Sequence, residues 1–171
     1  MMADMGIAEF LAARWDEREA AAKATGDDKA RTWSAESDIH PDAWRVIDGH
    51  GEVVVYDEGA PTEAEAAHIA LNDPAAVLAD IDAKRKILAE HARAPWFTED
   101  TLARWRTGGH VPEERIAAAG ASASCARCHK VIPDAAVDED QCADFDYPCP
   151  TVRLLAAPFA SHPEYQEAWK P

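Results

Sequence analysis

The sequence has few positive charges and no long hydrophobic run. Its 171 residues include 17 Lys and Arg against 32 Asp and Glu, which gives a formal net charge of −15. Negative charge of this size repels phosphate backbones and anionic lipids alike. No stretch approaches the roughly 18 consecutive apolar residues of a membrane-spanning helix. We therefore expect neither nucleic acid nor a membrane as a partner of this chain.

Export signals and catalytic motifs are also missing. Residues 1–24 carry charged side chains, among them Asp4, Glu9 and Arg14, where a signal peptide needs an uninterrupted apolar run. A cytoplasmic location is expected, and its reducing conditions disfavour structural disulfides. The sequence shows no Gly-rich phosphate loop, no nucleophile elbow and no helix with paired zinc-binding histidines. These absences predict that the protein is not an enzyme.

The first part of the chain carries clear local signals for one helix and a small sheet. Residues 6–24 have the periodicity of an amphipathic helix. Its apolar face consists of Ile7, Phe10, Leu11 and Trp15. Three short segments rich in Trp, Val and Ile follow, and they predict a three-stranded antiparallel meander. These segments are 31–37, 43–48 and 52–57.

Two further helices are marked by their first residues. Thr62 and Glu65 have the spacing of a capping box, which predicts the start of a short helix. Asp73 and Pro74 suit the N-cap and the first turn of a long helix over residues 74–91. We expect this long helix to pack across the sheet.

The remainder predicts shorter helices and completes the fold class. Two short helices are predicted to stop at Gly108-Gly109 and at Gly120. A third helix begins at Pro150 and is interrupted at Pro158, and a fourth begins at Pro163. The prediction is an α+β fold, a helix-rich single domain over 1–171 with a small three-stranded antiparallel sheet and a metal-stapled C-terminal loop. Its parts are a helix, meander and long helix in 1–92, a variable helical segment in 93–124, and a Cys-rich loop with C-terminal helices in 125–171.

All the cysteines lie in one polar stretch and suggest a metal site. Cys125 and Cys128 have the usual zinc-knuckle spacing, and Cys142 with Cys149 forms a second, more widely spaced pair. Four thiolates complete the tetrahedral coordination of zinc, and His129 could replace Cys142 or Cys149. Four protein ligands leave no position for water, so the predicted zinc is structural. A metal crosslink would also order a loop that has little apolar content of its own.

Other cofactors fit the sequence less well. Cys125 to His129 match the C-x-x-C-H pattern of covalent haem, but haem attachment normally needs export, and two cysteines would remain unexplained. Iron–sulfur clusters of the ferredoxin type use more compact spacings. A zinc deaminase would combine His50 and Glu52 with the first Cys pair, but His50 falls in a predicted hairpin turn. His68 and His91 are interpreted as capping or packing residues.

Three functions are compatible with this site. The leading hypothesis is a small acidic protein that binds another protein, of unknown identity, and contains structural zinc. The first alternative is a metal-dependent hydrolase in which three protein ligands leave one zinc position for water. The second alternative is a thiol-based redox sensor whose oxidation releases the metal. The number of protein ligands distinguishes the first two.

Three segments resemble a known family. They are "WRV" at 44–46, "HIALNDPAAVLADIDAKRKILAEH" at 68–91 and "CPTVRLLAAPFASHPEYQEAWKP" at 149–171. In these segments the chain resembles the domain-of-unknown-function family 6221 of actinobacteria and their phages. The resemblance covers roughly the first ninety residues and the last two dozen, and residues 92–124 look like a variable part. It implies a small intracellular protein of actinobacterial or phage source, and it supplies no catalytic residues.

Overall fold

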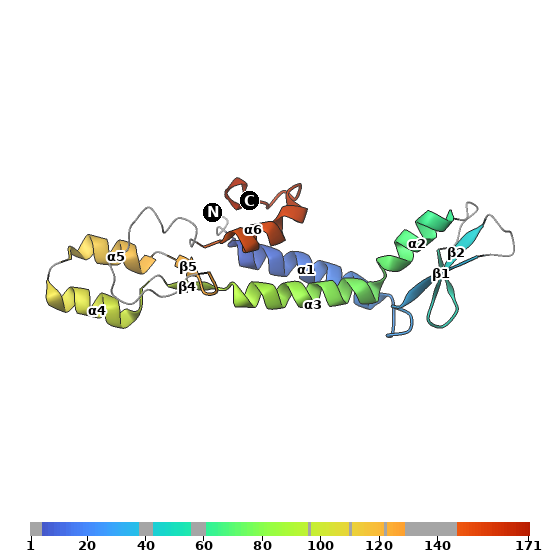
Figure 1. Ribbon diagram of the computed structural model, residues 1–171, viewed down its shortest axis with the longest axis horizontal. Coiled ribbons are helices and arrows are strands. Elements are labelled where there is room, and N and C mark those ends of the chain that lie inside the picture. The colour runs from blue at the N-terminus through green and yellow to red at the C-terminus, as the bar shows by residue number, and fades with distance from the viewer. Residues whose placement is uncertain are drawn as a thin grey trace. The chain divides into compact units, whose positions relative to one another are not determined.

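A computed structural model of the chain describes residues 5–37, 43–55, 61–95, 97–109, 111–121, 123–128 and 147–171. Its contacts divide the chain into two compact units, one formed by residues 12–85 and the other by residues 1–11 together with 86–171. The single-domain organisation stays a prediction. The predicted α+β class is confirmed, because helices dominate and a three-stranded antiparallel sheet is present (Figure 1).

The sheet of unit 12–85 is the predicted meander. Its strands are β1 (Trp33–Ser37), β2 (Trp44–Asp48) and β3 (Val53–Val55), in the order β1-β2-β3. Antiparallel pairing places Ala35 opposite Val46, and Val46 opposite Val55. Val46 is fully buried, so the central strand supplies the core of this unit on one face.

Helix α2 (Glu63–Leu71) packs on this sheet through β1 and β2. It begins with the predicted capping box, in which the Thr62 hydroxyl accepts from the Glu65 N–H and the Glu65 carboxylate accepts from the Thr62 N–H. Ala66 on its inner face is fully buried. We expected the long helix to cover the sheet, but the shorter α2 makes the extensive contacts.

Helix α3 (Pro74–Glu90) begins where the sequence predicts. Asp73 caps it by accepting a hydrogen bond from the Ala76 N–H at 2.6 Å, and its second oxygen accepts from the Trp33 N–H at 3.0 Å. One buried carboxylate therefore fixes both the helix start and the beginning of β1.

The part of helix α1 (Ile7–Ala24) that belongs to this unit runs beside α3 and is joined to it by ion pairs (Figure 1). Arg85 lies 2.6 Å from both Asp16 and Glu19. Hydrogen bonds from Arg85 and Lys23 lower the pKa of Glu19 to about 2.

The second unit has an aromatic core around the first turns of α1. The Phe10 ring is fully buried. Its centroid lies 6.0 Å from Phe159, 5.6 Å from His162, 6.2 Å from Tyr165 and 5.0 Å from Trp169. All four rings come after helix α6 (Pro150–Ala156). Phe159 is the last residue of the short 3-10 helix η3 (Ala157–Phe159), which starts next to the predicted interruption at Pro158.

A helical hairpin projects from a two-stranded sheet in the same unit (Figure 1). Strand β4 (Arg93–Pro95) leads into helices α4 (Glu99–Gly108) and α5 (Glu113–Ala121), and β5 (Ala123–Cys125) returns to pair with β4. Among the hairpin residues whose side chains the structure describes, Leu102 and Ile116 are buried.

Two predicted boundaries in this unit are wrong. Gly120 does not stop α5, which continues to Ala121. The helix expected from Pro163 is only a 3-10 turn, η4 (Glu167–Trp169), because Trp169 reaches the Phe10 ring through an irregular chain. Within the described ranges, no helix is both long enough and apolar enough to cross a membrane.

Candidate metal centre

The β4–β5 pair brings the end of α3 next to the first two cysteines. Arg93 lies opposite Cys125, and the Ala126 N–H donates to the Ala92 carbonyl at 2.9 Å. In this antiparallel register, His91 lies opposite the turn at residues 126–128. The β4–β5 pairing therefore positions one histidine and two cysteines together.

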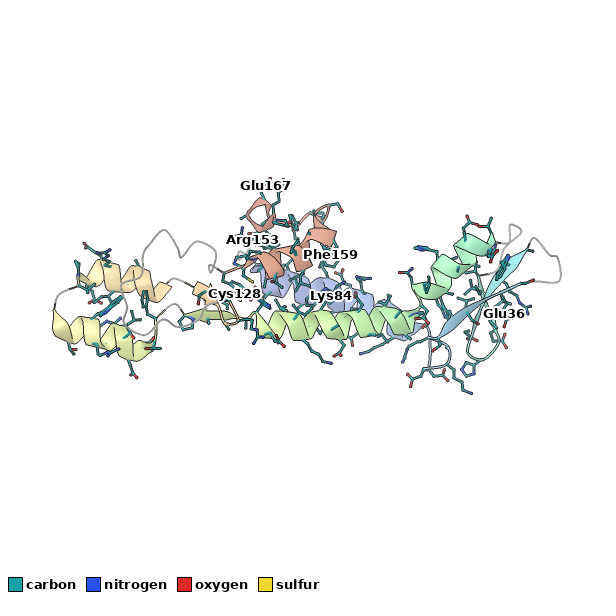
Figure 2. The ribbon with its side chains drawn as sticks, viewed as in Figure 1. Glu36, Lys84, Cys128, Arg153, Phe159 and Glu167 are labelled. Atoms are coloured by element: carbon teal, nitrogen blue, oxygen red, sulfur yellow. The ribbon has the colours of Figure 1, made fainter. Side chains whose placement is uncertain are left out.

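The third cysteine arrives from the other side of β5. The Tyr147 N–H donates to the Ala123 carbonyl at 3.1 Å, which holds the incoming chain against the strand. Cys149 follows as the N-cap residue of α6, and its carbonyl accepts from the Arg153 N–H. The Arg153 guanidinium also donates to the Pro148 carbonyl at 2.9 Å, so α6 fixes the turn that carries Cys149. Figure 2 shows Cys128 at the β4–β5 ribbon and Arg153 on α6.

The His91 ring nitrogen lies at the distances expected in a tetrahedral metal site from three sulfur atoms. The His91 Nδ1 atom lies 3.3 Å from the Cys125 sulfur, 3.6 Å from that of Cys128 and 3.4 Å from that of Cys149. All four donor atoms lie within 4.8 Å of one another. Zinc bonds of about 2.0–2.1 Å to nitrogen and 2.3 Å to sulfur place tetrahedral N and S ligands about 3.5–3.6 Å apart. These four side chains could hold a metal ion.

The thiols are reduced and differ in their exposure. Cys125, Cys128 and Cys149 are free, with no disulfide between them. Cys125 and Cys149 are fully buried, whereas Cys128 is partly exposed on its turn. The turn directs backbone N–H groups of Arg127 and Cys128 at the Cys125 sulfur, an arrangement that favours a thiolate there.

The pKa values of the Cys125 and Cys128 thiols are shifted in opposite directions. Burial raises the pKa of the Cys125 thiol, but hydrogen bonds from the backbone and from the other two thiols outweigh burial, so the pKa lies below its usual value. Burial and the neighbouring thiols of Cys125 and Cys149 raise the pKa of the Cys128 thiol to about 12. Burial, followed by the charges of Cys149 and Cys125, also raises the pKa of Tyr147. A bound dication would relieve this mutual repulsion.

Three of the four cysteines predicted as ligands are brought together, and an unpredicted histidine joins them. Cys142 and His129 lie outside the described residues, so their predicted roles stay predictions. His91 was interpreted as a capping or packing residue, but its ring nitrogen points at three sulfur atoms. No fixed sequence spacing marks it. His91 could have been identified from the pairing of residues 93–95 with 123–125, because this pairing places it beside Cys125 and Cys128.

His50, the histidine of the deaminase hypothesis, has a different partner. The His50 ring bonds the Asp27 carboxylate at 2.8 Å, next to the turn between β2 and β3. Among the residues that the structure describes, the only His, Cys, Asp and Glu group with donors close enough for a metal is the His91 cluster. The described part of the chain therefore offers no support for the deaminase hypothesis.

Comparison with known proteins shows the family of this chain. No curated protein and no solved structure matches it. One family model, described as a family of unknown function, matches residues 4–171. The match includes residues 92–124, the segment predicted to be a variable part. The actinobacterial or phage source stays a prediction. The chain belongs to the family of unknown function DUF6221.

Proposed function

We propose that this protein contains one structural zinc ion, bound by His91 Nδ1 and by the thiolates of Cys125, Cys128 and Cys149. The observation that carries the proposal is the set of three N···S distances between 3.3 and 3.6 Å. Packing of unrelated side chains gives no reason for three sulfurs to surround one ring nitrogen so evenly. A tetrahedral metal ion shared by the four side chains would explain this arrangement.

The chemistry of the donors favours zinc over other common metals. Thiolates and imidazole are soft or borderline ligands, and a tetrahedral set of S and N atoms suits zinc, whereas calcium and magnesium prefer oxygen ligands. Since the Nδ1 atom of His91 is the donor, the Nε2 atom carries the proton and remains available for a second hydrogen bond.

Four protein ligands make a structural role more plausible than a catalytic one. A hydrolytic zinc keeps one position for water and usually has three protein ligands. His91 supplies the fourth donor here, so the hydrolase alternative would require one of the four side chains to leave the metal.

The proposed ion joins three segments that are far apart in sequence. His91 directly follows α3, Cys125 ends β5, Cys128 lies in the turn after it, and Cys149 is the N-cap residue of α6. The two-stranded sheet has only three residue pairs, and α6 has seven residues, so local structure alone gives these segments little stability. Zinc binding would supply the free energy that holds them together.

At the level of the whole molecule, we propose that the protein acts by binding another protein and has no enzymatic activity of its own. The net charge of −15 supports a partner with a basic surface, because complementary charge speeds association. Leu154 on α6 is 61% exposed and could contribute an apolar contact. The cytoplasm is the compartment that keeps the cluster thiols reduced.

Metal analysis of protein purified without added metal tests the zinc centre. We expect one zinc per chain and no visible colour, and substitution by cobalt should give the absorption of a tetrahedral thiolate site. Cys149→Ser should lose the metal, whereas the matched variant Cys142→Ser should retain it. Iron–sulfur absorbance, or loss of zinc in Cys142→Ser with retention in Cys149→Ser, would refute the ligand set.

A further inference from the structure

The ligands of the metal centre are not equally protected from solvent. Cys125 and Cys149 are fully buried. Cys128 is partly exposed at the end of the turn 126–128, where Ala126 and Arg127 are also exposed. His91 is partly exposed too, but hydroperoxides oxidise thiolates and not imidazole under mild conditions. Cys128 is therefore the thiolate that a small oxidant can reach.

We propose that Cys128 is an oxidative modification site for hydroperoxides, and that Cys125 resolves the oxidised Cys128 as a disulfide that ejects the metal. The inference rests on the zinc centre proposed above and specifies its regulation. In this redox sensor, Cys128 is oxidised first and Cys125 then attacks the oxidised sulfur.

The geometry favours Cys125 as the resolving thiol. The sulfur atoms of the cluster lie within 4.8 Å of one another, so small side-chain movements bring two of them to bonding distance. Cys125 and Cys128 belong to one short turn, and closing a loop of this length costs little entropy. Cys149 is held by α6 instead, where Val152 and Ala156 are fully buried, so moving its sulfur would disturb a packed helix.

The chemistry balances with hydrogen peroxide as the oxidant. The Cys128 thiolate attacks one peroxide oxygen, an S–O bond forms as the O–O bond breaks, and hydroxide leaves. The Cys125 thiolate then attacks the Cys128 sulfur, an S–S bond forms as the S–O bond breaks, and a second hydroxide leaves. The two sulfurs lose two electrons in total, and the peroxide gains them.

Zinc cannot remain after this reaction. A disulfide is no longer a thiolate donor, so only His91 and Cys149 are left from the original four ligands. Metal release would disconnect the turn after β5 from the start of α6. The predicted consequence is a loosened C-terminal segment, 147–171, in the oxidised protein.

The test uses the zinc-loaded full-length chain and hydrogen peroxide. A metallochromic dye measures zinc release, and peptide mapping identifies the disulfide. We expect one Cys125–Cys128 disulfide for each zinc released, and Cys142→Ser should behave like the unmodified chain. Brief alkylation of the zinc-loaded chain, which needs no variant, should label Cys128 before Cys125 and Cys149.

Each contrary outcome has a separate meaning. Zinc that stays bound while peroxide is consumed, a disulfide that includes Cys142 or Cys149, or earlier labelling of Cys125 would overturn this inference and leave the structural zinc intact. A chain that contains no zinc before peroxide is added would overturn the zinc centre and the inference together.

Discussion

Replacing His91 with alanine tests the ligand that the sequence did not predict. The substitution removes the ring nitrogen that lies 3.3–3.6 Å from three sulfurs. It keeps the backbone, whose N–H donates to the Ile87 carbonyl at the end of α3. Alanine is also a good helix former, so the change should affect the metal centre far more than the helix.

The expected magnitude follows from the number of ligands. Structural zinc binds small zinc-finger peptides with about 10–16 kcal/mol near neutral pH. Divided over four ligands, this gives about 2.5–4 kcal/mol for each, or roughly a 100- to 1,000-fold change in affinity. Water can occupy the position vacated by His91, so we expect the lower end, a loss on the order of 100-fold.

Competition with a chromophoric chelator measures this loss. The pH must be held constant because protons compete with zinc for the thiolates. His68→Ala is the matched control, since His68 is an exposed histidine on α2 and does not belong to the cluster. The reasoning is refuted if His91→Ala binds zinc as tightly as the unmodified chain while Cys142→Ser does not.

Three further predictions concern the two compact units. Asp73→Ala should lower the free energy of unfolding by at least about 1 kcal/mol in urea titrations, because it removes a helix cap. The control Asp80→Ala should lower the free energy of unfolding by less than this, because it breaks only an exposed ion pair. Arg85→Gln should raise the pKa of Glu19 from about 2 toward its ordinary value of 4.5, as followed by NMR. In the unmodified chain, the stabilisation from this carboxylate should be complete above pH 4.5 and should disappear as the pH falls through about 2. Phe10→Ala should destabilise its unit by about 3–5 kcal/mol and should lower hydrogen-exchange protection in 157–171; unchanged protection there would contradict the aromatic core.

Features with local causes could be predicted from the sequence. The start of α2 depends on two side chains three residues apart, and the start of α3 depends on Asp73 and Pro74. The meander follows from three short segments joined by brief connections, of which residues 49–51 form a tight turn. The buried face of α1 follows from its periodicity, and Ile7, Phe10, Leu11 and Trp15 are all buried.

Features with long-range causes could not be predicted in the same way. The strands β4 and β5 have three residues each and are separated by the α4–α5 hairpin. Neither strand has a propensity that marks it, and Pro95 even argues against a strand. Because the sequence does not indicate the β4–β5 pairing, it also does not indicate that His91 and Cys125 lie close together. The cysteine spacing suggested a metal site but gave no information about a ligand located before the hairpin.

A metal ligand at residue 91 would stabilise the fold more than a ligand close to the other cysteines in sequence. A ligand directly after α3 would connect the long helix to the metal, whereas a fourth ligand within 129–146 would connect the C-terminal stretch only to itself. A crosslink stabilises a fold more when it closes a longer loop, and His91 and Cys149 are 58 residues apart. An ion bound by His91 would therefore order the β4–β5 pair, the base of the α4–α5 hairpin and the start of α6 in one step. If His91 kept its place beside the three cysteines after chelation of zinc, side-chain packing and not the metal would be the source of that order.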